Sequence, residues 1–128
     1  MVVSGLSAIV HEVQLAEELL TETFHMEHDP KVLLQVVKHT SNALEGAAEI
    51  TALSKKMEAL RALCAHILQE FKESPQVFAR KEKLAIASEG FEHIEILNEE
   101  SVTSILNESK ELIYQLTKVM TCQTQQKA

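Results

Sequence analysis

The 128-residue sequence contains few of the residues that punctuate or cross-link a chain: three Gly, two Pro, two Cys, one Tyr and no Trp. The two cysteines, Cys64 and Cys122, lie far apart and form no CxxC pair, which is typical of a reduced intracellular protein. No apolar run approaches the roughly 20 residues that span a membrane. The start, MVVSGLSAIVHE, does not resemble a signal peptide. We therefore expect cytoplasmic localisation and no membrane contact.

The residues that are abundant, Leu, Ala, Glu and Lys, are strong helix formers. A content of 45% hydrophobic and 24% charged residues indicates a globular chain, and the length suits one domain. The formal net charge of −7 opposes the binding of phosphate backbones, so it disfavours nucleic acid as a partner. The composition predicts a single all-α domain.

Apolar residues recur at helical spacing in four segments. The first helix is expected to open at Ser4, a good N-cap, and to run to about Phe24. Asp29 followed by Pro30 predicts the start of the second, because Asp caps orphan N–H groups and Pro has no N–H to leave unpaired. Asn98 is expected to cap the last helix. After residue 120 the polar stretch TCQTQQKA predicts a flexible C-terminal tail, residues 121–128.

No Gly or Pro marks a junction around residues 51–54, so the segment of residues 30–71 is compatible with one helix or two. A single helix of that length would measure roughly 60 Å, too long to bury within a compact domain. We therefore favour a turn near residues 53–55, with Ser54 capping a third helix that ends near Phe71.

Two local signals separate the third helix from the last. Ser74 and Pro75 repeat the cap-plus-proline pattern and predict a short helical turn through about Arg80. The stretch LAIASEGFEHIEI then alternates around a Gly-containing turn, which predicts a β-hairpin. A three-residue connection would pair Ile86 with Ile94 and Leu84 with Ile96, and would place all four on one buried face. The predicted fold is an all-α antiparallel four-helix bundle in residues 1–120, with a small β-hairpin before the last helix.

The stretch ETFHMEHDPK, residues 22–31, holds donors suited to a divalent metal ion, principally His25 and His28. A further ligand would have to come from elsewhere, and His39 is the nearest candidate. The competing interpretation is structural: His25 suits the negative end of a helix dipole, and Asp29 is a cap. Glu22 and His25 also match half of a di-iron bundle pattern, but that site needs a second Glu-x-x-His, which the sequence lacks.

RALCAH, residues 61–66, is similar to the R-x4-6-H signature of the HEPN family, helical-bundle proteins that include metal-independent ribonucleases. The resemblance implies that His66 transfers protons and that Arg61 stabilises phosphoryl charge, at sites paired across a dimer. Ala62 departs from the polar residue usual after the Arg. Residues five apart also lie about 140° apart on a regular helix, so convergence requires a local break. The alternative is a surface Arg beside an ordinary helix His.

Arg80, Lys81 and Lys83 form a basic cluster before the hairpin. They are candidates for contact with phosphate or an acidic partner. The alternative is a solvated edge that discourages strand pairing.

The segments HDPKVLLQVVKHTSNAL and SPQVFARKEKLAIASEGF, with the closing helix ESVTSILNESKELI, resemble a group of small uncharacterised archaeal helical-bundle proteins, HEPN-like in outline. That resemblance implies an archaeal, intracellular origin and no assigned activity. The leading functional hypothesis is a non-enzymatic interaction or regulatory module that binds a protein partner or associates with itself as a homodimer. The alternatives are a HEPN-like ribonuclease, or its inactive relative, and a divalent-metal binder. No cofactor is expected.

Overall fold

The computed structural model describes the backbone of most of the chain and the side chains of a smaller set. The described backbone covers residues 2–73, 76–80, 83–87 and 94–127, and the described side chains are those of residues 5–71, 79, 83–85 and 96–120.

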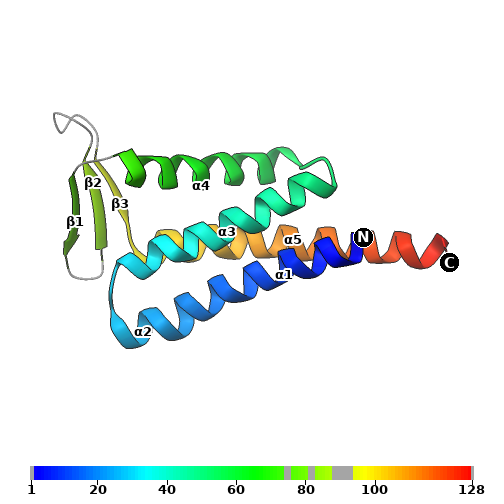
Figure 1. Ribbon diagram of the computed structural model, residues 1–128, viewed down its shortest axis with the longest axis horizontal. Coiled ribbons are helices and arrows are strands. Elements are labelled where there is room, and N and C mark those ends of the chain that lie inside the picture. Colours follow the sequence, from blue (N-terminus) through cyan, green and yellow to red (C-terminus); the bar gives the residue numbers. More distant parts are fainter. Residues whose placement is uncertain (1, 74–75, 81–82, 88–93, 128) are drawn as a thin grey trace.

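Over these residues the chain forms an all-α bundle with a small antiparallel sheet before the last helix, as the sequence predicted (Figure 1). The sheet lies at one end of the bundle, and both chain termini lie toward the other end (Figure 1). The elements in chain order are α1 (Val2–Glu18), the π-helical segment η1 (Leu19–Thr23), α2 (Phe24–Glu27), α3 (Lys31–Ile50), α4 (Lys55–Glu73), β1 (Gln76–Arg80), β2 (Lys83–Ala87), β3 (Ile94–Leu97) and α5 (Glu99–Lys127).

The first helical segment begins at Val2, so the prediction that it opens at Ser4 was wrong. It runs through η1 and α2 without interruption. Ala16, Leu20 and Phe24 are four residues apart, a spacing that drifts around a regular α-helix by about 40° per step. The wider π turn offsets this drift, and all three side chains remain buried. His28 ends the segment in the left-handed region, with φ of 54°.

The predicted second and third helices, which are α3 and α4, begin where the sequence predicted. The Asp29 carboxylate accepts a hydrogen bond from the Lys31 N–H at 3.0 Å. Ser54 Oγ accepts one from the Met57 N–H at 3.2 Å. Residues 30–71 therefore contain two helices, α3 and α4, joined by a short turn.

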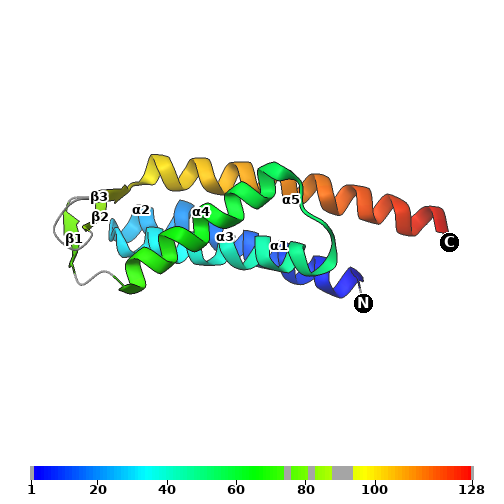
Figure 2. The same ribbon diagram turned by 90° about the horizontal axis from the view of Figure 1, so that it is seen from above.

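The start of α5 is capped reciprocally. Asn98 Oδ1 accepts a hydrogen bond from the Ser101 N–H at 2.8 Å, and Ser101 Oγ accepts one from the Asn98 N–H at 3.2 Å. The helix then continues to Lys127, so its backbone is helical where the sequence predicted a flexible tail. This last part of α5 extends beyond the ends of the other helices (Figures 1 and 2).

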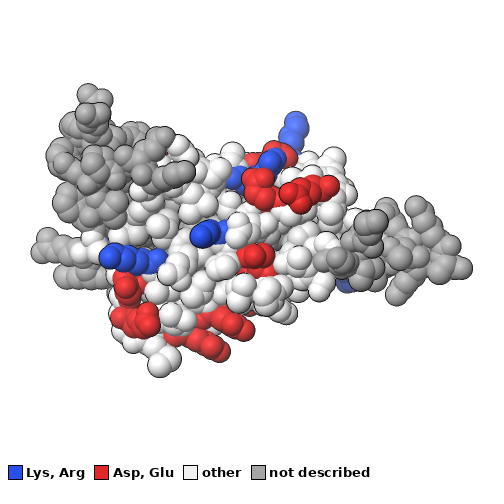
Figure 3. Space-filling model, viewed as in Figure 1, with Lys and Arg blue, Asp and Glu red and all other residues white. Residues whose placement is uncertain are grey.

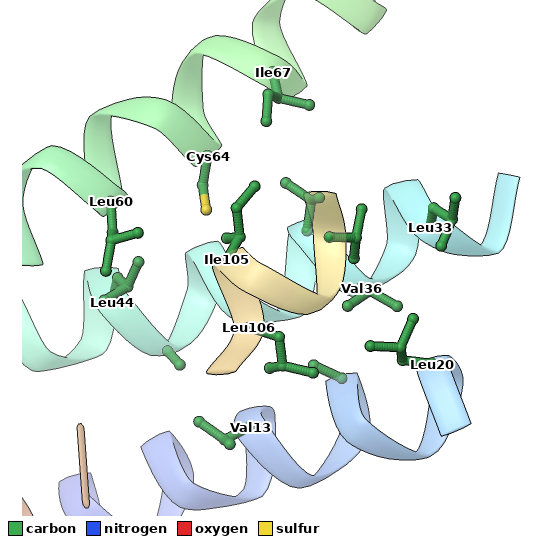
Figure 4. Close-up of a cluster of buried hydrophobic side chains, with 14 of the residues drawn as sticks. Val13, Leu20, Leu33, Val36, Leu44, Leu60, Cys64, Ile67, Ile105 and Leu106 are labelled. Carbon is green, nitrogen blue, oxygen red and sulfur yellow. The ribbon is translucent and has the colours of Figure 1, made fainter. Parts of the chain in front are cut away.

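Helix α3 occupies the centre of the bundle and packs against α1, α4 and α5. Figure 4 shows side chains from α1 with η1, from α3, from α4 and from α5 meeting in one core. Leu33, Val36 and Leu44 project from α3. Helices α1 and α3 approach closely at Gly46, where an added Cβ would lie only 2.9 Å from Cγ1 of Ile9.

The sheet differs from the prediction in two ways. Residues 76–80 form strand β1 rather than a helical turn, because they pair along their whole length with β2 in the order β1-β2-β3. Strands β2 and β3 pair with Leu84 opposite Leu97, one residue away from the predicted register. Leu84 and Leu97 are both buried, whereas Ile96 is 56% exposed. The predicted three-residue connection falls within residues 88–93, which lie outside the described residues, and so do the side chains of Ile86 and Ile94.

Gly46→Ala is expected to lower the free energy of unfolding by about 1 kcal/mol, even though Ala is the better helix former. The reason is that the new methyl group would force Ile9, and with it α1, away from α3. Gly5→Ala is the matched control, because a Cβ there meets Ile50 Cγ2 at an ordinary 3.4 Å. Urea denaturation would measure both, and a Gly46→Ala protein as stable as the Gly5→Ala protein would contradict this account.

Candidate functional site

The two histidines predicted as metal ligands lie exposed at the end of the first helical segment. His25 Nε2 lies 3.5 Å from the carboxylate of Glu99, at the start of α5. His39, the third candidate, has its Nδ1 2.6 Å from Glu12 Oε2 and so forms part of the α1–α3 contact. Among the described residues, no group of three or more His, Cys, Asp or Glu side chains is arranged to hold a metal ion.

Arg61, predicted as a catalytic residue, joins α4 to α3. Its Nε and Nη2 donate to the two carboxylate oxygens of Glu45 at 2.8 and 3.0 Å, and Nη1 lies 3.5 Å from Glu58. The hydrogen bonds from Arg61 lower the pKa of Glu45, and the same contact raises the pKa of Arg61. The guanidinium group is therefore held in a bidentate pair of the kind that orients two helices.

His66 lies elsewhere on α4, with its Nε2 3.5 Å from the Glu70 carboxylate. Helix α4 is regular from Lys55 to Glu73, so it contains no local break that would bring His66 toward Arg61. Within one chain the two residues point in different directions. The ribonuclease hypothesis stays a prediction, and it would require a second copy to complete a site.

Of the basic cluster, Arg80 ends β1 and Lys83 begins β2, and the two are opposite each other in the sheet register. Lys83 is exposed and lines a shallow depression against the start of α5. Lys81 lies outside the described residues, as does the side chain of Arg80.

Cys64 lies in the core, with none of its surface exposed. Burial raises the pKa of its thiol to about 11. A nucleophilic cysteine needs the opposite shift and an accessible sulfur atom. Cys64 therefore acts as a small apolar core residue, in agreement with its place in the sequence pattern. The side chain of Cys122 is outside the described set.

The feature that the sequence predictions missed is an apolar groove between α4 and α5, which we call the α4–α5 groove. Its volume is about 500 Å³. Figure 2 shows that the two helices diverge toward the end that carries the sheet, and β3 closes the groove there. The lining residues are Leu60, Leu63, Ile67 and Phe71 of α4, Ile96 and Leu97 of β3, and Ser101, Ser104, Ile105 and Glu108 of α5.

The floor and the rim of this groove differ in exposure. Leu60, Ile67 and Ile105 are buried, whereas Leu63 is 41% exposed and Ile96 is 56% exposed. The signal in the sequence was Leu63, an apolar residue that lies beside the predicted stripe of α4 rather than on it. When the apolar stripe of a helix is broader than one core contact requires, the excess indicates a second apolar contact.

The charges beside the groove are mainly acidic. Ser104 and Glu108 also line the neighbouring depression, which has a volume of about 720 Å³. Its described lining contains one cation, Lys83, and the carboxylates of Glu99, Glu100 and Glu108. On another face of the molecule, acidic side chains gather along the edge formed by α1 and α2, and basic and acidic side chains lie intermixed near the junction of α3 and α4 (Figure 3). The described side chains of these two surfaces do not form the concentrated positive charge that binding to a phosphate backbone needs.

Comparison of the chain with protein-family models, with curated protein sequences and with solved structures finds no significant match. Within the part of the chain that the structure describes, no helix combines the length and apolarity needed to traverse a bilayer.

Stability is expected to fall as the pH rises from about 9 to about 11, because Cys64 keeps its proton in the folded protein and loses it in the unfolded chain. The raised thiol pKa contributes fully below pH 9.0, its ordinary value, and up to about 3 kcal/mol is lost as the pH passes the folded value. Urea denaturation at pH 8 and pH 11 would measure the change.

Cys64→Ala is the control for this pH dependence, since other groups that titrate over the same range are shared by both proteins. Its stability should change less between pH 8 and pH 11 than that of the parent. Equal slopes in the two proteins would show that the buried thiol makes no such contribution.

Proposed function

We propose that this protein is a non-enzymatic interaction module that binds a protein partner in the α4–α5 groove. The observation that carries the proposal is the apolar rim of the groove, where Leu63 and Ile96 lie exposed beside a buried apolar floor. Clustered apolar surface on a folded domain is a mark of an interaction site. Both a second copy of the chain and a different protein are compatible with this proposal.

The size of the groove supports binding rather than incidental roughness. Its volume of about 500 Å³ is that of a pocket that holds a small molecule, so the groove has room for side chains of a partner. Covering the exposed parts of Leu63 and Ile96 would stabilise a complex by roughly 2 kcal/mol, before the buried floor contributes further contacts. In protein interfaces a few well-packed residues carry most of the binding energy.

The polar groups of the groove favour recognition over catalysis. Among its lining side chains the hydroxyls are those of Ser101 and Ser104, and the carboxylate is that of Glu108. Neither a histidine nor a cysteine is among the described residues that line the groove, so no hydroxyl of this described lining has the adjacent imidazole base that activates a serine nucleophile. Hydroxyl and carboxylate groups at the edge of an apolar surface are typical of an interface rim.

A pull-down with matched variants tests the proposal. The parent protein, Leu63→Ser/Ile96→Ser and Met26→Ser/Val119→Ser would each be tagged and used to capture proteins from a lysate of the source cells. Met26 and Val119 are exposed apolar residues outside the groove, so the second variant controls for the general loss of apolar surface. We expect the groove variant to lose the partner at least tenfold, and the control variant to retain it.

Hydrogen–deuterium exchange then locates the contact. The captured partner should protect residues 60–71 and 96–108 of the parent protein. Partners captured equally by all three proteins, or protection confined to other segments, would overturn the proposal. Circular dichroism of each variant establishes that the substitutions leave the bundle folded.

A further inference from the structure

We infer that the occupant of the α4–α5 groove is an amphipathic α-helix of a partner protein, with Lys or Arg beside its apolar stripe. This inference rests on the proposed function, and it adds the chemistry of the partner. It depends on three observations: the shape of the groove, the contrast between its two walls and the charge along α5.

The shape of the groove suits a helix. Its α4 wall extends from Leu60 to Phe71, which is about 16 Å at 1.5 Å per residue. That length matches three turns of a docked helix, which would present apolar residues at positions i, i+3, i+4 and i+7. Because both long walls are helices, an added helix would complete a layer of the bundle with the same packing of ridges into grooves.

The two walls of the groove differ in polarity. The α4 wall consists of Leu60, Leu63, Ile67 and Phe71, all apolar. The α5 wall contains Ser101, Ser104 and Glu108 together with the buried Ile105. A helix in the groove would therefore turn its apolar stripe toward α4 and the floor, and a polar flank toward α5.

The charge along α5 determines the sign of that flank. Glu100, Ser104 and Glu108 are four residues apart and so follow one strip of the helix surface, and all three are exposed. Glu111 extends the acidic row by a further turn and is also exposed. Lys110 is paired with Glu17 of α1 at 3.0 Å, on another side of α5. Basic residues on the partner would face these carboxylates, and such rim charges set specificity and the rate of association.

The same acidic row argues against a second copy as the occupant. In a two-fold dimer each surface meets its own image. Glu100, Glu108 and Glu111 would then lie near the same residues of the other copy, and like charges in an interface are unfavourable. The chain's net charge of −7 adds to this repulsion. A basic partner converts the same carboxylates into attractive contacts.

Three fluorescein-labelled peptides of 18 residues test the inference by fluorescence anisotropy in 150 mM salt. The first is an amphipathic helix with a Leu stripe and Lys flanks. The second has the same stripe with Glu flanks, and the third is a scramble of the first with the same composition but no stripe. The parent protein is expected to bind the first peptide at least tenfold more tightly than either of the others.

Protein variants separate the contributions of the apolar and charged residues. Leu63→Ser/Ile96→Ser should weaken binding of the first peptide at least tenfold. Glu100→Lys/Glu108→Lys should weaken the Lys-flanked peptide and strengthen the Glu-flanked one. Glu18→Lys/Glu22→Lys makes the same change in net charge on the α1–α2 edge, where both residues are exposed, and should leave the preference of the groove unchanged.

Each other outcome overturns the inference. Equal binding of the scramble would show that charge alone attracts the peptide. Equal binding of both amphipathic peptides would remove the role of the acidic row. A parent dimer that dissociates in Leu63→Ser/Ile96→Ser, measured by sedimentation, with no peptide binding, would make a second copy the occupant. Displacement of the peptide by laurate but not by the captured partner would indicate an acyl ligand. A captured partner that needs Leu63 and Ile96 but does not compete with the peptide would overturn the helix and leave the proposed function standing.

Discussion

The burial of α3 is the constraint on which the rest of the structure depends. Leu33, Val36, Val37 and Leu44 of this helix are completely buried, and burial of each such side chain stabilises the fold by about 1.5–3 kcal/mol. The buried residues of α3 extend around the helix from Val32 to Ser41, about 180° at 100° per residue, so α1, α5 and α4 surround α3 on different sides (Figures 1 and 4). Helices α1, α4 and α5 each lie where they cover part of the apolar surface of α3.

The α4–α5 groove is a consequence of that arrangement. Helix α4 directs Cys64 and Leu60 toward α3, and the bidentate Arg61–Glu45 pair fixes the same side of α4 against α3. The side of α4 next to the one that contacts α3 faces the α4–α5 groove. This side carries Leu63. Helix α5 packs against α3 and α1, and it follows a different line from α4 toward the sheet (Figure 2). The apolar residues of the groove are therefore left without the full cover that the core receives.

Local sequence signals predicted the helices well and the sheet poorly. Asp29, Ser54 and Asn98 act through hydrogen bonds to N–H groups two or three residues away, so their effect is readable from the sequence alone. The register of β2 and β3, and the existence of β1, depend on pairing between strands and on the length of their connections. The groove was not predicted. Leu63 is a signal that could have indicated a second apolar contact, but the divergence of α4 from α5 depends on how both helices pack against α3. Arg61 and His66 fit the R-x4-6-H signature only by their spacing in the sequence. On a regular helix, residues at that spacing point in different directions.

The solvent accessibility of methyl groups tests whether the α4–α5 groove is open in solution. Addition of a soluble paramagnetic agent to methyl-labelled protein enhances the NMR relaxation of methyl groups that water can approach. If the groove is open, we expect strong relaxation enhancement for the methyl groups of Leu63 and Ile96. The methyl groups of Leu33, Leu44 and Val36 should show little enhancement. Weak enhancement at Leu63 and Ile96, equal to that of the α3 core, would show that the groove is closed in solution and would contradict the account.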